Sequence, residues 1–358
     1  MSNLFALLAF SRGPAMKNCF MLAPRTNTQS HADGRLSDDE FKWLEMRATG
    51  GFGLTMTCAA HVQASGQGFP GQLGAFSDDH LAGLTRMAAA IKAKDSIAVV
   101  QLHHAGMRAP AALIGEQPHC PSTDEETGAR ALSTGEVGAL VEDFILAAKR
   151  AEAAGFDGVE VHSAHGYILS QFLSPEINRR EDEYGGDLAG RSRVIFDIVN
   201  GIRARCKPDF NVSIRLSPER FGLRLAEVRE VAQGLMAEGA INFLDMSLWD
   251  VFKEPVEEDF KGRGLFSYFT DLDRGEVKLG VAGKVNSVRA ANQCPDQGVD
   301  FVLLGRAAIL HHDFPLQAMG NADFQSTPLP VSADYLRAQG LGEDFLVYMS
   351  NWKGFIAA

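Results

Sequence analysis

The sequence predicts an α/β protein whose parallel strands close into a (β/α)8 barrel, the TIM-barrel architecture. Short apolar runs alternate with longer amphipathic runs along most of the 358 residues, and eight of the short runs read as buried strands. Almost every short run ends in polar residues or glycine, as expected where a barrel carries its chemistry. An open doubly wound sheet is the alternative, which is disfavoured because no Gly-x-Gly-x-x-Gly follows the first strand.

The expected strands are short and rich in β-branched residues, leucine and phenylalanine, without the polar alternation of a half-exposed sheet. They cover residues 19–22, 54–58, 97–102, 158–162, 212–216, 243–247, 277–282 and 301–304.

The expected helices lie between these strands, and several begin at a capping residue. Ser37 precedes Glu40 by three residues and Ser77 precedes His80 in the same way, which favours helix starts at both places. The helices cover residues 37–49, 78–94, 134–154, 188–206, 226–238 and 288–297.

The chain 1–358 is expected to form a single domain, with the barrel over residues 18–320 and a C-terminal tail over 321–358. Long connections over residues 103–133 and 249–276 decorate the barrel and are expected to form walls above its mouth. The aromatic residues of the tail predict docking, either on this barrel or on a second copy, which would give a homodimer.

Composition restricts the function. Apolar residues make up 46% and charged residues 22% of the chain, which is typical of a globular protein. The net charge of −11 disfavours nucleic acid and anionic membranes as partners. The five cysteines include no Cys-x-x-Cys pair, and no apolar run has the length of a membrane span, so a reducing, cytoplasmic location is expected.

The most informative stretch is GFDGVEVHSAHGYILSQF, residues 155–172. A helix stop at Gly155 precedes a buried strand, and the polar side chains His162, His165 and Tyr167 follow at the end of that strand. Gly166 permits a tight turn there, so the two imidazoles and the phenol are expected to converge on one point. The sequence therefore predicts a reaction centre at this strand end.

Two other strand ends combine glycine with a cation. Gly283-Lys284 and Gly305-Arg306 follow the seventh and eighth strands, where barrels build phosphate sites from backbone amides. Ordinary turns are the alternative, but the pairing at these two strands favours phosphate. Arg215 ends the fifth strand and requires an anion, either Glu160 or an electron-rich ligand. The side-chain amide of Gln101 can both donate to and accept from the edge of a heterocycle, and the alternative is a buried glutamine whose hydrogen bonds are made with the backbone.

These features resemble the Old Yellow Enzyme family of flavin mononucleotide (FMN)-dependent oxidoreductases, which are (β/α)8 barrels that reduce activated alkenes with a nicotinamide donor. The resemblance extends in family order over residues 18–306. It is carried by NCFMLAPRT (18–26), QLHHAG (101–106), the 155–172 stretch, NRREDEYGG (178–186), IRLS (214–217) and LGR (304–306).

The resemblance implies roles for single residues. Pro24, Thr26 and Ala59 lie along the flavin; Gln101 and Arg215 contact its pyrimidine side; Gly283, Gly305 and Arg306 hold its phosphate; His162 and His165 bind the substrate oxygen; and Tyr167 donates a proton. The implied cofactors are non-covalent FMN and NAD(P)H, and the implied substrate is a small α,β-unsaturated carbonyl compound. Hydride would pass from NAD(P)H to FMN and then to the β-carbon, while Tyr167 protonates the α-carbon.

The sequence departs from the family at two places near this site. Arg25 stands where an apolar residue is usual, which favours acidic substrates or places a cation in solvent. Met107 replaces the usual arginine, and Arg108 follows one position later.

A zinc-dependent barrel hydrolase is the alternative from another class of enzyme. Its ligands would come from the strand-end histidines His103, His104, His162 and His165. Their spacing after strands does not aim two imidazoles at one ion, and no strand-end aspartate completes the set. A barrel that only binds a ligand is a third possibility, which the intact His162, His165 and Tyr167 disfavour.

Overall fold

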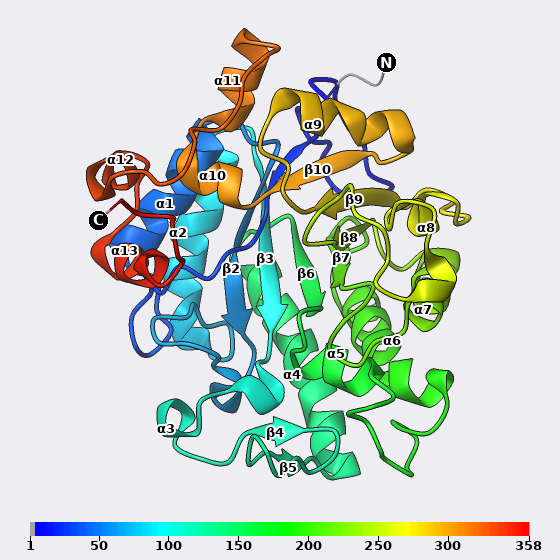
Figure 1. Ribbon diagram of the computed structural model, residues 1–358. Coiled ribbons are helices and arrows are strands. Elements are labelled where there is room, and N and C mark those ends of the chain that lie inside the picture. Colours follow the sequence, from blue (N-terminus) through cyan, green and yellow to red (C-terminus); the bar gives the residue numbers. More distant parts are fainter. Residues whose placement is uncertain (1–3, 358) are drawn as a thin grey trace.

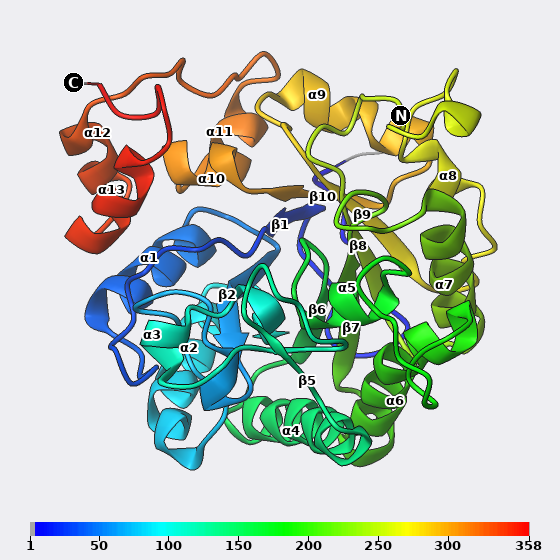
Figure 2. The same cartoon turned by 60° about the horizontal axis from the view of Figure 1, so that its bottom comes forward.

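The computed structural model describes residues 4–357 and contains a closed barrel of eight parallel strands. In Figures 1 and 2 the strands form the centre of the molecule and the helices form a ring around them. The order around the barrel is β1-β10-β9-β8-β7-β6-β3-β2, so the last strand of the chain pairs with the first. The strands are β1 (Phe20–Leu22), β2 (Leu54–His61), β3 (Ile97–His103), β6 (Gly158–Ser163), β7 (Asn211–Leu216), β8 (Phe243–Ser247), β9 (Lys278–Ala282) and β10 (Phe301–Leu304).

The outer layer is made of helices that follow the strands, and shorter helices belong to the loops and the tail. The longer helices are α1 (Asp38–Thr49), α2 (Leu81–Lys92), α4 (Thr134–Ala153), α6 (Leu188–Arg205) and α7 (Leu225–Ala237). The shorter ones are α3 (Ala111–Ile114), α5 (Ile168–Leu173), α8 (Ser267–Thr270), α9 (Val288–Gln293), α10 (Arg306–Leu310), α11 (Phe314–Gly320), α12 (Ala333–Ala338) and α13 (Glu343–Ser350).

The apolar pattern of each element explains its position. All seven residues of β3 and all six of β6 are buried, as expected for strands covered on both faces. On α4 the buried residues Val137, Leu140, Phe144 and Ala148 recur at helical spacing and face the barrel. Ser133 caps this helix, because its hydroxyl accepts a hydrogen bond from the Glu136 amide. The Glu136 carboxylate in turn accepts one from the Ser133 amide, so two backbone donors at the helix start are paired.

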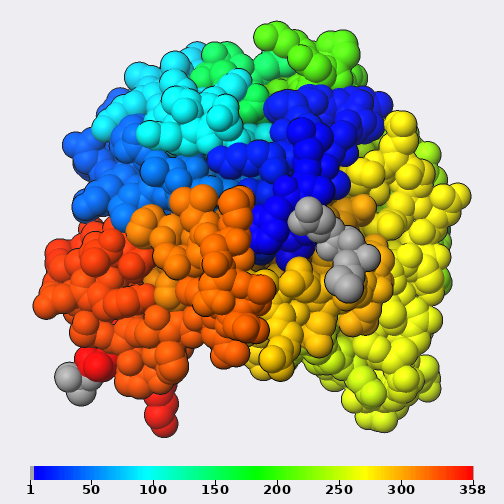
Figure 3. Space-filling model, turned by 90° about the horizontal axis from the view of Figure 1, so that it is seen from above, coloured from blue at the N-terminus to red at the C-terminus, as the bar shows by residue number. Residues whose placement is uncertain are grey.

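The N-terminal segment lies across the end of the barrel opposite the site. Leu8 and Met16 form an antiparallel bridge, and the Arg12 guanidinium donates to the carbonyl of Gly239 beside the start of β8. Phe10 packs on Phe243 with ring centroids 5.5 Å apart. Figure 3 looks onto this face and shows the dark blue segment lying between the helices of the first and last units.

The predicted strands are confirmed, and the differences lie at their ends and in the connections. Strand β2 is longer than expected, because a register shift between Met56 and Ala59 allows pairing with β3 to continue to His61. The helix expected over 78–94 begins with a separate 3₁₀ turn, Asp78–His80, and the helix expected over 288–297 ends in another, Pro295–Gln297. A small two-stranded sheet, β4 (His119–Cys120) and β5 (Arg130–Ala131), interrupts the connection expected to be a loop.

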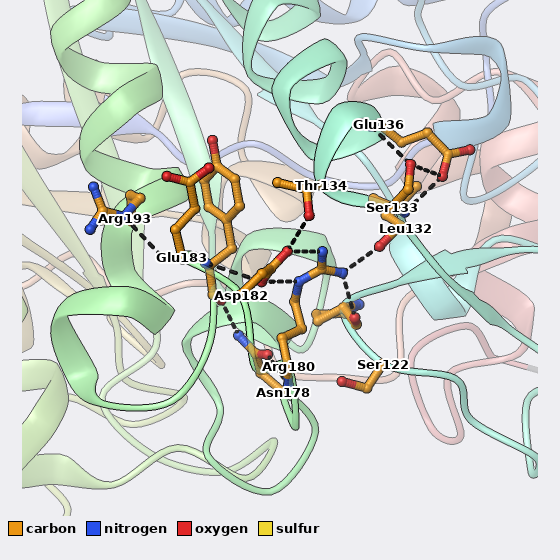
Figure 4. Close-up of polar contacts among 12 residues, drawn as sticks. Ser122, Leu132, Ser133, Thr134, Glu136, Asn178, Arg180, Asp182, Glu183 and Arg193 are labelled. Atoms are coloured by element: carbon orange, nitrogen blue, oxygen red, sulfur yellow. Dashed lines mark hydrogen bonds and ion pairs between the residues drawn. The ribbon is translucent and has the colours of Figure 1, made fainter.

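The NRREDEYGG segment ties two long connections together (Figure 4). Arg180 forms an ion pair with Asp182 and donates to the carbonyls of Pro121 and Leu132. Asp182 accepts a bond from the Thr134 hydroxyl at 2.6 Å, and these donors lower its pKa. Asn178 donates to the carbonyls of Phe172 and Tyr184. The segment therefore has a structural role, because its hydrogen bonds and ion pair hold the loop after β6 against the start of α4.

The C-terminal tail packs on its own barrel. Phe345 of α13 lies edge-on to Trp43 of α1, with centroids 4.9 Å apart, and the Gly342 amide donates to the Gln29 side chain. Trp352 lies against the Arg25 guanidinium at 5.1 Å. Association of two copies through the tail stays a prediction. Within residues 4–357, no helix combines the length and the apolar character that a membrane crossing requires.

Candidate active site

Two adjoining cavities lie at the C-terminal ends of the barrel strands. The larger has a volume of about 950 Å³ and the smaller about 120 Å³, and Pro24, Arg25, His165, Tyr167 and Arg215 line both. The structure brings every residue predicted for the site to their walls. Pro24, His165, Tyr167, Arg215, Gly283, Gly305 and Arg306 line the larger cavity, and Thr26, Ala59, Gln101 and His162 line the smaller.

Strand register explains this convergence. Ala59 of β2 pairs with Gln101 of β3, and Gln101 pairs with Glu160 of β6. One layer higher, His162 of β6 pairs with Arg215 of β7, and Arg215 pairs with Asp245 of β8. Residues paired across neighbouring strands lie at the same height in the barrel and point to the same side of the sheet. Residues far apart in the sequence therefore face the barrel interior together.

The two histidines at the end of β6 contact each other. His162 Nε2 lies 3.1 Å from His165 Nδ1, and His165 Nε2 lies 2.7 Å from the Ser247 hydroxyl. The chain turns back between them because His165 and Gly166 both have left-handed backbone angles, with φ of 59° and 71°. The Ser217 hydroxyl accepts from the His165 amide and holds this turn in place.

The bonding pattern assigns the imidazole protons. His162 Nδ1 accepts from the Ala164 amide at 3.4 Å, so the proton of a neutral His162 is on Nε2 and points at His165. His165 then accepts through Nδ1 and donates from Nε2 to Ser247. Burial and nearby arginines lower the pKa of both imidazoles well below its usual value, so both are neutral.

Tyr167 begins α5 immediately after this turn. Its ring lies edge-on to His103 at 4.3 Å and to His162 at 5.1 Å, and the Arg108 guanidinium lies 4.8 Å from its centroid. Burial raises the pKa of the phenol, although the charge of Arg108 opposes this shift. The phenol is therefore protonated at neutral pH.

Arg108 has a defined place despite its shifted position in the sequence. One of its guanidinium nitrogens donates to the backbone carbonyl of His165, in addition to the contact with Tyr167. Although Met107 replaces the usual arginine, Arg108 therefore still places a guanidinium beside the turn formed by residues 162–166, here called the histidine turn.

Below the histidines lies a buried cluster of charged groups. Arg215 pairs with Asp245 at 2.9 Å, whereas Gln101 donates to Glu160 at 2.7 Å. Of the two partners considered for Arg215, Glu160 is not the one it pairs with, because Asp245 stands opposite Arg215 in the strand register. Burial raises the pKa of Glu160 to about 8, and repulsion from Asp245 adds to the shift. Burial likewise raises the pKa of Asp245, opposed by Arg215.

The opposite side of the larger cavity has glycines and guanidinium groups without acidic partners. A Cβ at Gly283 would meet the backbone nitrogen of Asp250 at 2.8 Å, and a Cβ at Gly305 would meet Cδ of Arg25 at 3.4 Å. Within residues 4–357, neither Arg25 nor Arg306 forms an ion pair, and the buried Nε of Arg25 has no hydrogen-bond partner. Guanidinium groups without acidic partners, one of them with an unbonded buried Nε, beside the cavity-lining Gly283 and Gly305 fit the phosphate of a flavin nucleotide.

The electrostatic character of the larger cavity contrasts with that of the chain. The chain has a net charge of −11, yet the cavity wall contains seven cationic side chains and one carboxylate, Asp250. A cavity lined by charges of one sign concentrates ligands of the opposite sign. The seven cations are Arg25, Arg108, Arg215, Arg220, Lys253, Lys284 and Arg306.

The zinc alternative finds no support. His103 bonds through Nδ1 to the Gln72 amide, whereas His104 accepts from the Gly106 amide and stacks on His119. Throughout the described chain, residues 4–357, no cluster of three histidine, cysteine or acidic side chains is arranged to bind a metal ion.

Sequence reasoning missed several residues of the site. Ser217 and Ser247 stand at strand ends, which was the available signal for their contacts with His165. Asp245 lies two residues before Ser247, so strand alternation points both to the interior. Arg220 and Trp249, in the loops after β7 and β8, carry no sequence signal that would place them together.

Comparisons with known proteins agree with this geometry. The family model described as the NADH:flavin oxidoreductase / NADH oxidase family matches residues 3–322. A probable NADH-dependent flavin oxidoreductase, YqiG of Bacillus subtilis, is 32% identical over 86% of this chain and 85% of its own length. Three longer relatives match over only 33% to 48% of their length.

Solved structures give the same result. The old yellow enzyme homologue from Zymomonas mobilis superposes with a TM-score of 0.80 and 25% identity, covering 94% of this chain and 96% of that one. Morphinone reductase in complex with tetrahydroNAD gives a TM-score of 0.77 and 27% identity, covering 94% of both chains. The chain therefore belongs to the NADH:flavin oxidoreductase / NADH oxidase family, the Old Yellow Enzyme family, and is an oxidoreductase that uses FMN and a nicotinamide hydride donor.

Proposed function

We propose that this protein is an ene-reductase that reduces the C=C bond of α,β-unsaturated carbonyl compounds. The observation that carries the proposal is the placement of the protonated Tyr167 phenol beside the neutral His162–His165 pair in one cavity wall. Hydrogen-bond donors and a proton source in one place are what the reduction of a polarised alkene requires from a protein.

The residues for FMN come from both sides of the cavities. Gly283, Gly305 and Arg306 would hold the phosphate, whereas Gln101 and Arg215 would contact the ring. Pro24, Thr26 and Ala59 line the wall along which the ring would lie. When bound, FMN supplies the hydride chemistry, by accepting hydride from NAD(P)H and passing it to the alkene carbon β to the carbonyl.

The histidines bind and polarise the substrate oxygen. In the present arrangement the Nε2 proton of His162 is directed to His165, and that of His165 to Ser247. A carbonyl oxygen entering between the rings would accept these protons in place of the protein acceptors. Both imidazoles are uncharged, so they stabilise the developing enolate by hydrogen bonding without forming an ion pair in the resting site.

Tyr167 completes the reaction by protonating the α-carbon. Its raised pKa keeps the proton on the phenol at the pH where the enzyme works, and the nearby Arg108 stabilises the phenolate that remains after transfer. The buried Arg215 stabilises negative charge at the ring edge, and Asp245 fixes the guanidinium in that direction.

The visible spectrum of the purified protein tests this proposal. Flavin absorption should bleach when NADH or NADPH is added without oxygen, and cyclohexenone should restore it with formation of cyclohexanone. A protein that is bleached by NAD(P)H and reoxidised only by oxygen, not by cyclohexenone or other enones, would contradict ene-reduction while leaving the flavin oxidoreductase assignment intact.

A further inference from the structure

The loop that follows β7 places an unusual arginine beside the histidine turn. Arg220, Phe221 and Gly222 all have left-handed backbone angles, with φ of 69°, 57° and 71°. For the first two residues this conformation costs about 1 kcal/mol or more each, so the surrounding structure must enforce it. A strained loop at the wall of a cavity indicates a constraint on where its side chains point.

The same loop is attached directly to the reaction centre. A Cβ on Gly166 would meet the Phe221 ring at 2.7 Å, so Phe221 packs on the turn between His165 and Tyr167. Ser217, three residues before Arg220, accepts the His165 amide at 3.0 Å. Whatever Arg220 binds therefore lies next to the groups proposed to polarise and protonate the substrate.

The guanidinium of Arg220 lies over an aromatic ring. It lies 4.8 Å from the ring centroid of Trp249, which follows β8 and is 53% exposed at the rim of the larger cavity. Trp249 also has a left-handed backbone angle, with φ of 65°, and lies two residues after Ser247, the partner of His165. This stacking orients the guanidinium edge while leaving its N–H groups available.

The nearby carboxylates are committed to other cations. Glu219, the immediate neighbour of Arg220, pairs with Lys253 and accepts the Val256 amide. Asp250 pairs with Lys284 at 2.9 Å. Arg220 itself has no ion pair and no side-chain hydrogen bond to any residue in the described range 4–357.

The charge at Arg220 is not explained by the phosphate of FMN. The groups suited to that phosphate, Gly283, Gly305 and Arg306, follow β9 and β10, whereas Arg220 follows β7 and immediately precedes Phe221, which packs on Gly166 of the histidine turn. The cavity therefore has cations without acidic partners on its β7 side as well as on its β9–β10 side, and the phosphate of the cofactor accounts only for those near β9 and β10.

We propose that the preferred alkene substrate carries a carboxylate, and that Arg220, stacked on Trp249, binds this carboxylate while His162 and His165 bind the activating carbonyl. The inference rests on the proposed ene-reductase function and adds the substrate class. It predicts that a substrate spans from the histidine turn to the rim of the larger cavity, with its anionic end outward.

The test compares one reactive core with and without a charge. The substrates are a cyclohexenone with a propanoate side chain and the methyl ester of the same compound. Reoxidation of the NADH-reduced holoenzyme is followed by stopped-flow absorption with wild-type protein, Arg220→Gln and Arg220→Lys. Arg224→Gln is the matched control, because this arginine lies in the same loop, does not line the cavity and has a 63% exposed side chain.

Wild type should prefer the acid over the ester. Arg220→Gln should reduce this preference about 10- to 100-fold, as expected for loss of a charge-assisted contact. Arg220→Lys should keep part of it, Arg224→Gln should keep all of it, and added salt should weaken it. Titration of oxidised holoenzyme with the saturated acid gives an equilibrium readout, in which Arg220→Gln should weaken binding of the acid but not of the saturated ester.

Three results would overturn the inference. The first is equal use of acid and ester by wild type, and the second is an equal loss for both substrates in Arg220→Gln. The third is a loss confined to the reduction of FMN by NADH or NADPH, which would assign Arg220 to the phosphates of the donor. If neither compound reoxidised the flavin, the proposed function would fail as well, whereas reduction of the ester alone would leave it standing.

Discussion

The ends of β6 and of β9–β10 face each other across one cavity but are built in opposite ways. At the end of β6 the functional groups are bound to each other and to the protein, through the His162–His165 contact and the serine partners of His165. At the ends of β9 and β10, Gly283 and Gly305 line the cavity beside Arg306, which has no ion-pair partner within residues 4–357.

The difference separates what the protein forms alone from what a ligand completes. The two imidazoles of the histidine turn are held by the protein before substrate arrives, and a substrate oxygen has only to replace His165 and Ser247 as acceptors of their protons. The side after β9 and β10 carries uncompensated positive charge, which only a bound anion neutralises. Substitutions on the first side should therefore change the rate, and those on the second should change cofactor affinity.

The largest effect should come from the β6 side. In His162→Ala, loss of one donor to the substrate oxygen should slow alkene reduction about 10²- to 10³-fold. Stopped-flow measurement of both half-reactions checks this, since flavin reduction by NADH in the same variant serves as the internal control. An equal loss in both half-reactions would mean that His162 supports the structure of the cavity and not the alkene step.

A smaller effect is expected on the β9–β10 side. Arg306→Gln should weaken FMN binding about 10- to 100-fold, because a charged contact to phosphate is lost. Fluorescence titration of apoprotein with FMN measures this, and Arg289→Gln on α9, outside the cavities, is the matched control. At saturating FMN the variant should turn over at close to the wild-type rate; a large loss of rate there would contradict the division between the two sides.

The sequence predicted the two sides unequally well. The strands and their ends followed from apolar runs and from the polar residues that terminate them, so the predicted His162, His165, Tyr167, Gly305 and Arg306 do lie at the cavity walls. The hydrogen-bond partners of the histidines were not predicted, because His165 and Ser247 are 82 residues apart in the sequence and meet only through the pairing of β6 with β7 and of β7 with β8.

The buried charges show a further limit of sequence reasoning. Arg215 was expected to require an anion, but the choice between Glu160 and Asp245 is made by which residue stands opposite it on the neighbouring strand. Short helices such as α5, α12 and α13 were missed because they depend on tertiary packing more than on their own periodicity. The stacking of Arg220 on Trp249 joins two irregular loops and has no local pattern.

The smallest effect concerns the pH dependence of stability that comes from Glu160, in the buried charged cluster beneath the histidines. The pKa of Glu160 is about 8 in the folded protein, above the ordinary value of about 4.5, so the folded state binds more protons between these pH values. The contribution of Glu160 to the free energy of unfolding of the apoprotein should therefore fall as pH rises from about 4.5 through about 8, whereas the lowered pKa values of His162 and His165 make their own contributions rise with pH. Glu160→Gln should remove the falling contribution, measured by urea unfolding at several pH values. A profile identical to wild type would show that Glu160 titrates normally.

If Tyr167 supplies the proton to the alkene carbon, single-turnover kinetics of Tyr167→Phe should separate the two half-reactions. The variant should bind FMN and be reduced by NADH at rates within about twofold of wild type. Its reoxidation by cyclohexenone should be about 10²- to 10⁴-fold slower, the range for loss of a general acid. Tyr268→Phe, whose hydroxyl bonds to the Phe260 carbonyl, is the matched control and should behave as wild type. Reoxidation of Tyr167→Phe by cyclohexenone at the wild-type rate would contradict the account.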